Sequence, residues 1–471
     1  MKLTQRLVVL VVVVVCALVA IPATSYADAT TSTQTATPQQ TFSQDAVPIY
    51  DAAGLQTMAQ NPTGSYRLMA DVDLTGVAWQ PLDFQGTLEG DGHAILNASV
   101  SGVGGSRRTT YDGNLKSYDT VFSGFFGTLE GAVVRNVRLL GVEVDAVTDE
   151  PTFVGCLCGY IDNATIENCM VVGEASLATS GACFGVGGIA GFGNGRILSN
   201  TVDATLVCRD TDAQNKDEQF MGGGYANGYA DLESNAITIR GYDSDHGYVH
   251  DGGMAGMYIL YPEGTEYAGT ITNNHVSGFI TFFEDNEDRR AYCDPEIGEN
   301  MSPDNITRGG NTNDFTADER FEYGTDLLPH TCANPTWNDQ QLASSCTEWG
   351  CTQRICTSCG YSYRTAWLPR SHKVDGWTLE GTPQSDGSAI RKGVCTACGE
   401  TVYEHVSASE ATGLSHQPNE AQANIDQAQT HTATVSRGGK GGVIRILVIG
   451  AAVAAAVALL GLIIWTVVHK R

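Results

Sequence analysis

Alternating apolar and polar residues fill the middle of the chain, and their parity changes at one recurring residue type. In the stretch Val133–Val144, Val134 lies two residues before Asn136, whereas Val137 lies one residue after it. Side chains i and i+2 of a strand share one face, so this change cannot occur within a straight strand. Asparagine tolerates left-handed backbone conformations and bonds to the nearby main chain, as a corner requires. The pattern predicts two short strands joined by a corner at Asn136.

The same arrangement repeats along the chain. Three asparagines are spaced 32 residues apart, and a glycine lies nine residues before each of them. The asparagines are Asn136, Asn168 and Asn200, the glycines are Gly127, Gly159 and Gly191, and weaker copies surround Asn97, Asn235 and Asn274. Recurrent corners at a fixed period are typical of a solenoid, whose coils stack on one another. We therefore expect the corner amides to lie above one another as a ladder.

The period also predicts which residues share a column of the stack. The aligned sets are Cys158 with Phe126 and Ala190, and Cys169 with Val137 and Thr201. Because these are core columns, we expect both thiols to act as small buried hydrophobic groups.

The pattern as a whole predicts an all-β chain in which residues 46–283 form a parallel β-helix, or β-solenoid. An antiparallel sandwich with regularly spaced turns is the alternative, and the fixed column of glycine and asparagine favours the solenoid. After this region, the polar and acidic residues 284–325 are interpreted as a linker.

The repeats also resemble a known family. The stretches SGFFGTLEGAVVRNVRLLGVEV and VGGIAGFGNGRILSNTVDATL are similar to the glycine-rich GLUG-type repeats of bacterial surface proteins. The preceding stretch, IYDAAGLQTMAQNPTGSYRLMADVDLTGVAWQPLDFQGTLEGDGHAILN, resembles the usual N-terminal part of such domains. The resemblance covers about Ala46–Phe283. It implies a β-solenoid of the kind found in exported adhesins and in the non-catalytic parts of large surface enzymes.

The N-terminal residues carry an export signal. Lys2 and Arg6 precede the apolar run Leu7–Ile21, and small residues typical of a cleavage site follow it. This order predicts a signal peptide over 1–27 and a linker over 28–45.

The C-terminal residues contain a candidate membrane span. Ile446–Val468 carries no charge and is long enough to cross a bilayer. We therefore expect a single-pass protein of the cell membrane, with a transmembrane helix over 443–468, a cytoplasmic tail over 469–471 and an extracellular ectodomain. A buried helix of a soluble domain is the alternative for this segment.

Residues 326–405 have a different composition and contain two Cys-x-x-Cys-Gly elements. Their cysteines are Cys356 and Cys359 in the first, and Cys395 and Cys398 in the second. A Leu-Pro…His…Trp element precedes each, at 328–337 and 368–377, so the region is interpreted as a duplicated unit of about 40 residues. The following residues 406–442 are rich in Ala, Gln, Ser, Thr and Gly, a composition typical of a flexible stalk.

The four cysteines of these elements are candidate metal ligands. The predicted metal-ligand set is Cys356, Cys359, Cys395 and Cys398. Four thiolates in a tetrahedron suit zinc, and such a closed site is structural rather than catalytic. Disulfides are the alternative, because export leaves the reducing cytosol and makes Cys332, Cys346 and Cys351 available as partners. Thirteen cysteines remain after the one in the signal peptide, so at least one thiol stays outside intramolecular disulfides.

The charge balance and the motifs narrow the function classes. The chain has 53 acidic and 27 basic residues and a formal net charge of -26, which argues against nucleic acid as a partner. No zinc-protease, hydrolase-elbow or phosphate-loop motif occurs in the sequence. The short stretch Asp91-Gly92-His93 is interpreted as a turn rather than as a catalytic group.

We therefore expect a non-enzymatic cell-surface protein whose solenoid serves adhesion or binds an unknown extracellular protein or glycan. The alternative is a β-helix enzyme that processes polysaccharides at the cell surface. Such an enzyme needs acidic and basic residues clustered on one strand face. Residues 120–207 contain only Arg135, Arg138 and Arg196 as basic residues and no histidine, which favours binding over catalysis.

Overall fold

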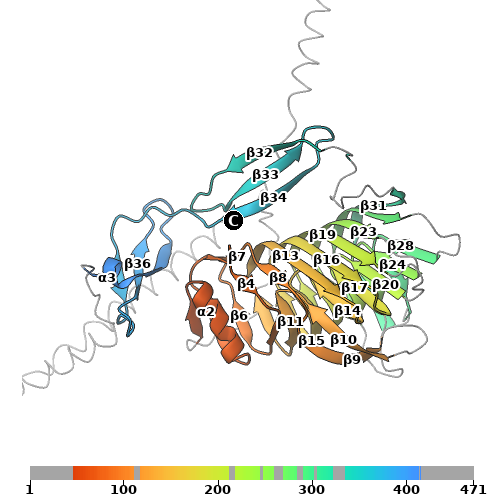
Figure 1. The fold of residues 1–471 in the computed structure, drawn as a ribbon, viewed down its shortest axis with the longest axis horizontal. Coiled ribbons are helices and arrows are strands. Elements are labelled where there is room, and N and C mark those ends of the chain that lie inside the picture. The colour runs from red at the N-terminus through yellow and green to blue at the C-terminus, as the bar shows by residue number, and fades with distance from the viewer. Residues whose placement is uncertain are drawn as a thin grey trace, which may run out of the picture. The chain divides into compact units, whose positions relative to one another are not determined.

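The computed structural model describes residues 46–110, 117–211, 218–243, 248–258, 269–283, 290–301, 305–321, 332, 335–412 and 414. Over these residues the chain is mostly β (Figure 1). The predicted signal peptide, the first linker, most of the stalk and the C-terminal apolar segment lie outside the described residues. Within the described ranges, no helix is both long enough and apolar enough to cross a membrane.

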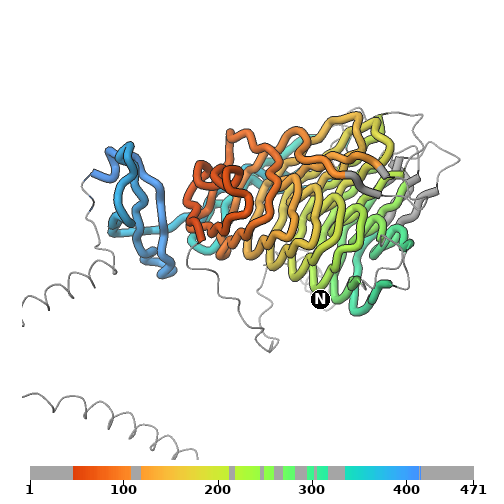
Figure 2. The backbone as a smooth tube through the Cα atoms, turned by 90° about the horizontal axis from the view of Figure 1, so that it is seen from below, coloured from red at the N-terminus to blue at the C-terminus, as the bar shows by residue number. Residues whose placement is uncertain are grey.

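Strands of one repeat pair in parallel with the strands of the next. One repeat consists of β14 (Thr152–Gly155), β15 (Cys158–Glu167) and β16 (Met170–Thr179), and the next of β17 (Cys183–Gly187), β18 (Ala190–Leu198) and β19 (Thr201–Asp210). β14 lies beside β17, β15 beside β18 and β16 beside β19. These stacked parallel sheets are consistent with a β-solenoid, and Figure 2 shows the successive coils side by side. An antiparallel sandwich would pair consecutive strands, so that alternative is excluded.

The described strands of the coils form three sheets: β15 and β18 belong to sheet A, β16 and β19 to sheet B, and β14 and β17 to sheet C. Sheet A also contains β1 (Val47–Ile49), β2 (Ser65–Leu68), β5 (Leu82–Phe84), β6 (Thr87–Glu89), β11 (Phe126–Glu130), β12 (Val133–Arg135), β21 (Tyr225–Gly228), β22 (Asp231–Glu233), β25 (Ala255–Tyr258), β26 (Gly269–Thr272), β29 (Ile297–Asn300) and β30 (Ile306–Gly309). Sheet B also contains β3 (Val72–Asp73), β4 (Ala78–Trp79), β7 (Ala94–Leu96), β8 (Ser99–Ser101), β13 (Arg138–Thr148), β23 (Ala236–Asp243), β27 (His275–Phe283) and β31 (Thr312–Phe321). Sheet C also contains β9 (Ser106–Thr110), β10 (Ser117–Ser123), β20 (Glu218–Gly222), β24 (Tyr248–Gly252) and β28 (Arg290–Asp294). Pairing is parallel throughout except between β9 and β10, which form an antiparallel hairpin.

A short helix covers the first coil. Helix α2 (Ala52–Gln56) begins after Asp51, whose side chain accepts a backbone hydrogen bond of 2.8 Å from the first turn. The 3₁₀ turn η1 (Thr57–Gln60) follows it directly. Leu55 and Met58 from these two elements are fully buried in the core. They cover apolar surface that the terminal coil of a stack would otherwise leave open.

Apolar side chains from all three sheets meet in one continuous core. Val134, Ile166 and Ile197 occupy one column of sheet A and are fully buried. Cys158 and Cys169 are buried as predicted, and burial raises the pKa of the Cys169 thiol to about 12. These thiols therefore stay protonated and pack as small hydrophobic groups.

The corner asparagines adopt the predicted conformation. Asn136 has a φ of 57° and lies between β12 and β13, and Asn168 has a φ of 50° and lies between β15 and β16. Few residues other than glycine and asparagine occupy this left-handed region. The change of parity in the sequence is therefore a corner between two strands, as expected.

In the repeats with the 32-residue period, the register shifts at two bulges, Gly141 in β13 and Asn163 in β15. Asn163, with a φ of 50°, is a bulged residue in β15, and the pairing with β18 shifts there by one position. The Cys158 alignment lies before the bulge and is confirmed. The Cys169 alignment with Thr201 is wrong: its partner is Asn200, whose Oδ1 accepts a hydrogen bond of 2.9 Å from the Cys169 N–H.

An amide ladder exists, but it is shifted by one column from the predicted one. The ladder consists of Asn200, Asn235, Asn274 and Asn311. Its three side-chain hydrogen bonds measure 3.1, 2.9 and 3.2 Å, and the first three residues are at most 2% exposed. The Asn168 side chain is exposed. Within the described residues its one hydrogen bond runs from its Nδ2 to Asn136 Oδ1 at 2.6 Å. The predicted stack of Asn136, Asn168 and Asn200 is therefore wrong beyond its first pair.

The solenoid continues beyond Phe283, where the polar and acidic composition predicts a linker over 284–325. β28, β29, β30 and β31 add a further coil that ends at Phe321, and β31 pairs with β27. Ile297 and Phe315 bury their side chains in the core. The remaining described positions of this coil are largely polar and exposed, so its composition hid the alternation.

The Cys-rich region contains two three-stranded antiparallel sheets, one in each copy of the duplicated unit. The first unit consists of β32 (Trp337–Leu342), β33 (Gly350–Cys356) and β34 (Ser362–Leu368), and the second of β35 (Thr378–Glu380), β36 (Ala389–Val394) and β37 (Thr401–Val406), followed by helix α3 (Ala408–Ala411). In each unit the Cys-x-x-Cys-Gly element connects the second strand to the third. The described residues from Val47 onward belong to one compact unit, which includes both sheets and the solenoid.

Candidate metal centres

Each Cys-x-x-Cys-Gly element forms the same tight turn, called a knuckle below. Gly360 N–H donates to Cys356 O at 2.9 Å, and Gly399 N–H donates to Cys395 O at 2.9 Å. The two glycines have φ values of 78° and 79°, which disfavour residues that carry a side chain. The turn therefore places the two sulfur atoms of each knuckle close together.

The first cluster consists of Cys332, Cys356 and Cys359, whose sulfur atoms lie within 4.8 Å of one another. The Cys332 and Cys356 sulfur atoms are 3.7 Å apart. Hydrogen bonding to Cys359, together with burial, raises the pKa of the Cys332 thiol to about 12. A full set of thiolates here therefore needs a cation to neutralise it.

The second cluster consists of Cys346, Cys395 and Cys398, which also lie within 4.8 Å of one another. The backbone N–H groups of Cys398 and Ala397 lower the pKa of the Cys395 thiol to about 6. That thiol is therefore largely ionised at neutral pH, and the thiolate is the form that binds metals. His372 Nδ1 lies 3.6 Å from the Cys398 sulfur, so an imidazole nitrogen adjoins this cluster.

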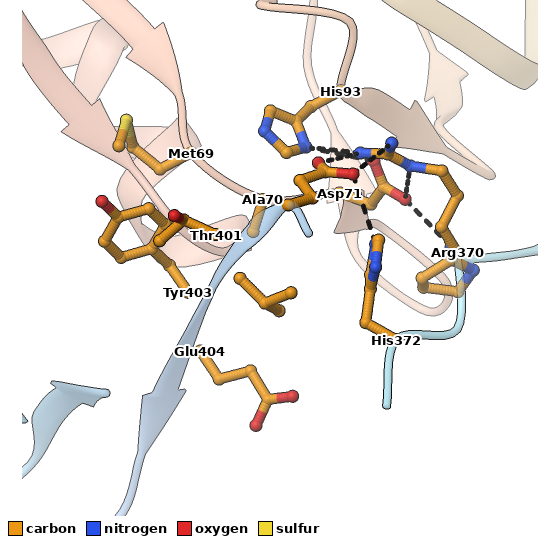
Figure 3. A pocket seen from close by; sticks show the side chains of 12 residues that line it. Met69, Ala70, Asp71, His93, Arg370, His372, Thr401, Tyr403 and Glu404 are labelled. Atoms are coloured by element: carbon orange, nitrogen blue, oxygen red, sulfur yellow. Dashed lines mark hydrogen bonds and ion pairs between the residues drawn. The ribbon is translucent and has the colours of Figure 1, made fainter. Parts of the chain in front are cut away.

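Figure 3 shows a pocket lined by charged side chains, among them His372, which also adjoins the second cluster. Asp71, His93, Arg370 and His372 line a cavity of about 130 Å³, with Glu400 among its other lining residues. Burial raises the pKa of Asp71, but the hydrogen bond to His93 and the Arg370 guanidinium outweigh burial and lower it to about 2. The Asp71 carboxylate is therefore ionised and paired. Asp91-Gly92-His93 forms the predicted turn. The turn places His93 Nδ1 at 3.0 Å from a guanidinium nitrogen of Arg370.

The structure divides the predicted metal ligands between the two clusters. Cys356 and Cys359 lie together in the first, and Cys395 and Cys398 lie together in the second. A single site with all four thiols is not formed, because each knuckle closes its own three-stranded sheet and faces a cysteine from another segment. No single ion therefore has to bridge the two knuckles.

Three residues near the sulfur atoms were not in the predicted ligand set: Cys332, Cys346 and His372. The sequence contained a signal for two of them, because Cys332 and His372 each lie four residues after the leucine of a Leu-Pro element. They occupy equivalent positions in the duplicated units. Cys346 has no counterpart in the second unit, so the repeat could not have assigned it.

The cluster chemistry favours a metal over disulfides. A disulfide joins only two of the three thiols in a cluster, whereas one zinc ion uses them all. Zinc also takes an imidazole nitrogen as a fourth ligand, and His372 offers one at the second cluster. A site with four protein ligands leaves no position for a substrate, so this ligand set at the second cluster suits a structural role.

Comparison of the sequence with protein-family models and with curated proteins found no match. The stacked parallel sheets are thus established from the structure alone, and the likeness to GLUG-type proteins contributes to the proposal below.

Proposed function

We propose that the chain is a membrane-anchored bacterial cell-surface protein, in which a parallel β-helix of the GLUG type is displayed for adhesion or ligand binding. The β-helix faces the exterior on a Cys-rich stem that contains structural zinc. The stalk over 406–442 lifts this ectodomain from a single transmembrane helix over 443–468. The ligand is an extracellular protein or a glycan, and the protein has no catalytic activity.

The observation that carries this proposal is the in-register stack of coils. In sheet B, β13, β16, β19, β23, β27 and β31 follow one another as parallel neighbours. Backbone hydrogen bonds and a continuous core fix such a stack, so its outer side chains are free to vary for recognition.

The connections between coils support a binding role. The ends of β13, β16 and β19 lie side by side in sheet B, and the starts of β14, β17 and β20 lie side by side in sheet C. The connections after β19 and β27 are longer than those after β13 and β16. Loops that differ in length on a rigid scaffold are the usual location of binding residues.

The topology is tested by producing the full chain, and a chain that lacks Ile446–Arg471, in a Gram-positive host. We expect the full chain in the membrane fraction, with its ectodomain degraded when protease is added to intact cells. The shortened chain should appear in the medium. Its retention in the cytosol would contradict the proposed topology.

The binding role is tested with the shortened chain on glycan and protein arrays. The same chain is incubated with acidic polysaccharides, and new reducing ends are measured. Saturable binding without new reducing ends supports display. New reducing ends would instead support the polysaccharide-processing alternative.

A further inference from the structure

Three segments of the Cys-rich region meet at the second cluster. Cys346 comes from the connection between β32 and β33 of the first unit, whereas Cys395 and Cys398 come from the knuckle of the second unit. His372 comes from the segment that joins the two units, and its Nδ1 lies 3.6 Å from the Cys398 sulfur. A single ion bound here connects both units to each other.

His372 is held in the manner of a metal-ligating histidine. Its other ring nitrogen, Nε2, lies 3.9 Å from a carboxylate oxygen of Glu400. A carboxylate in this place orients the imidazole and makes it a stronger ligand. The His372 side chain is only 10% exposed, so its orientation is restricted by packing as well. Three thiolates and this nitrogen form one of the four-ligand sets of structural zinc.

Glu400 connects this histidine to the first coil of the solenoid. Its carboxylate accepts hydrogen bonds of 3.2 and 3.1 Å from Arg370. Arg370 N–H donates to Asp71 Oδ2 at 2.9 Å, and Trp349 Nε1 donates to the same oxygen at 3.0 Å. The Asp71 side chain is 6% exposed, so the hydrogen bonds to Asp71 are shielded from water, and this shielding strengthens them.

A second contact fixes β34 to the same coil. Trp367 N–H donates to Asn97 Oδ1 at 2.9 Å, and Asn97 Nδ2 donates to Trp367 O at 2.9 Å. Asn97 has a φ of 55° and is the corner residue of this coil. The Trp367 ring is buried in a cluster with Leu96 and Leu140. The Cys-rich region therefore packs on the solenoid through both polar and apolar contacts.

We propose that Cys346, Cys395, Cys398 and His372 form a zinc centre that locks the Cys-rich region onto the first coil of the solenoid. The inference deepens the proposed function, since it rests on zinc being bound in the stem. The ion fixes His372, the imidazole positions Glu400, and Glu400 holds the Arg370 side chain against the solenoid. Loss of the ion weakens the contacts of His372 with Glu400 and of Glu400 with Arg370, while the core of the solenoid remains intact.

The centre is tested by measuring the zinc content of the purified full-length chain and its variants. We expect about two equivalents in the wild type, one for each cluster, and about one in Cys346→Ser. Cys351→Ser is the matched control, because Cys351 is a buried cysteine outside both clusters and its replacement leaves two equivalents. Two equivalents in Cys346→Ser would overturn the centre.

The role of His372 is tested by titration with a competing chelator. His372→Ala should release the second ion at a chelator concentration roughly tenfold or more below the one that the wild type requires. His405→Ala is the control, because this histidine of the second unit contacts Asp51 of the solenoid and no cysteine cluster. Identical release from the wild type and His372→Ala would remove His372 from the centre.

The lock is tested by amide hydrogen exchange in residues 365–371. Cys346→Ser should exchange these amides roughly tenfold faster than the wild type, whereas Cys351→Ser, which keeps both ions, should not. Peptides from β19 are the internal reference and should stay protected in every variant. Unchanged protection of 365–371 in Cys346→Ser would overturn the lock.

Glu400→Gln separates the lock from folding of the centre, since it leaves all four ligands in place. We expect two equivalents of zinc and faster exchange in residues 365–371. Wild-type exchange in this variant would show that Glu400 does not transmit the effect and would overturn the proposed connection. The fractionation and array assays do not depend on these results, so failure of the lock and failure of the surface role are distinguishable.

Discussion

Asparagine has two roles at the corners of this solenoid, and the backbone conformation separates them. Asn168 turns the corner itself with a positive φ, and its side chain is exposed. At Asn235 the preceding Ser234 takes the positive φ of 59°, and the asparagine side chain is buried. Its Nδ2 then donates to Ile197 O of the previous coil at 2.8 Å. The same residue type thus supplies either a conformation or a set of buried hydrogen bonds.

This difference predicts different costs of substitution. Asn235→Ala should lower the free energy of unfolding by about 1–3 kcal/mol, because it leaves buried backbone groups without partners. Asn168→Gly should change it little, since glycine adopts a positive φ without strain. Urea titrations of the full chain followed by circular dichroism measure both effects. Equal destabilisation by the two substitutions would contradict the two roles.

Residue-scale prediction from sequence succeeded where the signal was local. Parity places the corner at Asn136, because only neighbouring residues decide it. The bulge at Asn163 escaped prediction, since the spacing from Asn168 to Asn200 is the same as in the previous repeat although the register has shifted. A constant spacing in sequence therefore does not prove a constant register in space.

At the scale of elements, the last coil shows why composition misplaced the end of the solenoid. β31 has several acidic and polar residues, yet Phe315 reaches the core and is 8% exposed. One buried aromatic residue in a polar strand is a weak alternation signal. The second knuckle shows the same limit, because it is recognisable by itself, whereas its third cysteine, Cys346, comes from the first unit.

The last coil predicts an effect that a linker would not show. Phe315→Ala should destabilise the chain by about 3 kcal/mol, the cost of a large cavity in a core. The neighbouring Thr316→Ala should have almost no effect, because Thr316 is exposed. Thermal unfolding of the two variants measures the difference. A wild-type midpoint for Phe315→Ala would mean that residues 290–321 do not contribute to the core.

At the scale of the molecule, the solenoid and the Cys-rich region differ in what stabilises them. The solenoid has a continuous apolar core that extends from Ile49 to Phe315. The second Cys-rich unit has only a small cluster, built from Leu379, Ala389 and Val406 with a helix residue. So little apolar surface rarely stabilises a domain without a metal or a disulfide. The two parts should therefore respond differently to reagents that act on sulfur.

Chelation should unfold the Cys-rich region and leave the solenoid intact. Structural zinc in small peptides supplies roughly 10–16 kcal/mol of folding free energy. The small apolar cluster of the second unit cannot replace a contribution of this size. We expect a strong chelator to change the fluorescence of Trp367 and Trp377, while the β-sheet signal in circular dichroism persists. Mild reductant with zinc present is the control and should change neither signal. The disulfide alternative predicts the reverse: a signal indifferent to chelator and lost on reduction would reject zinc and leave a disulfide-linked stem.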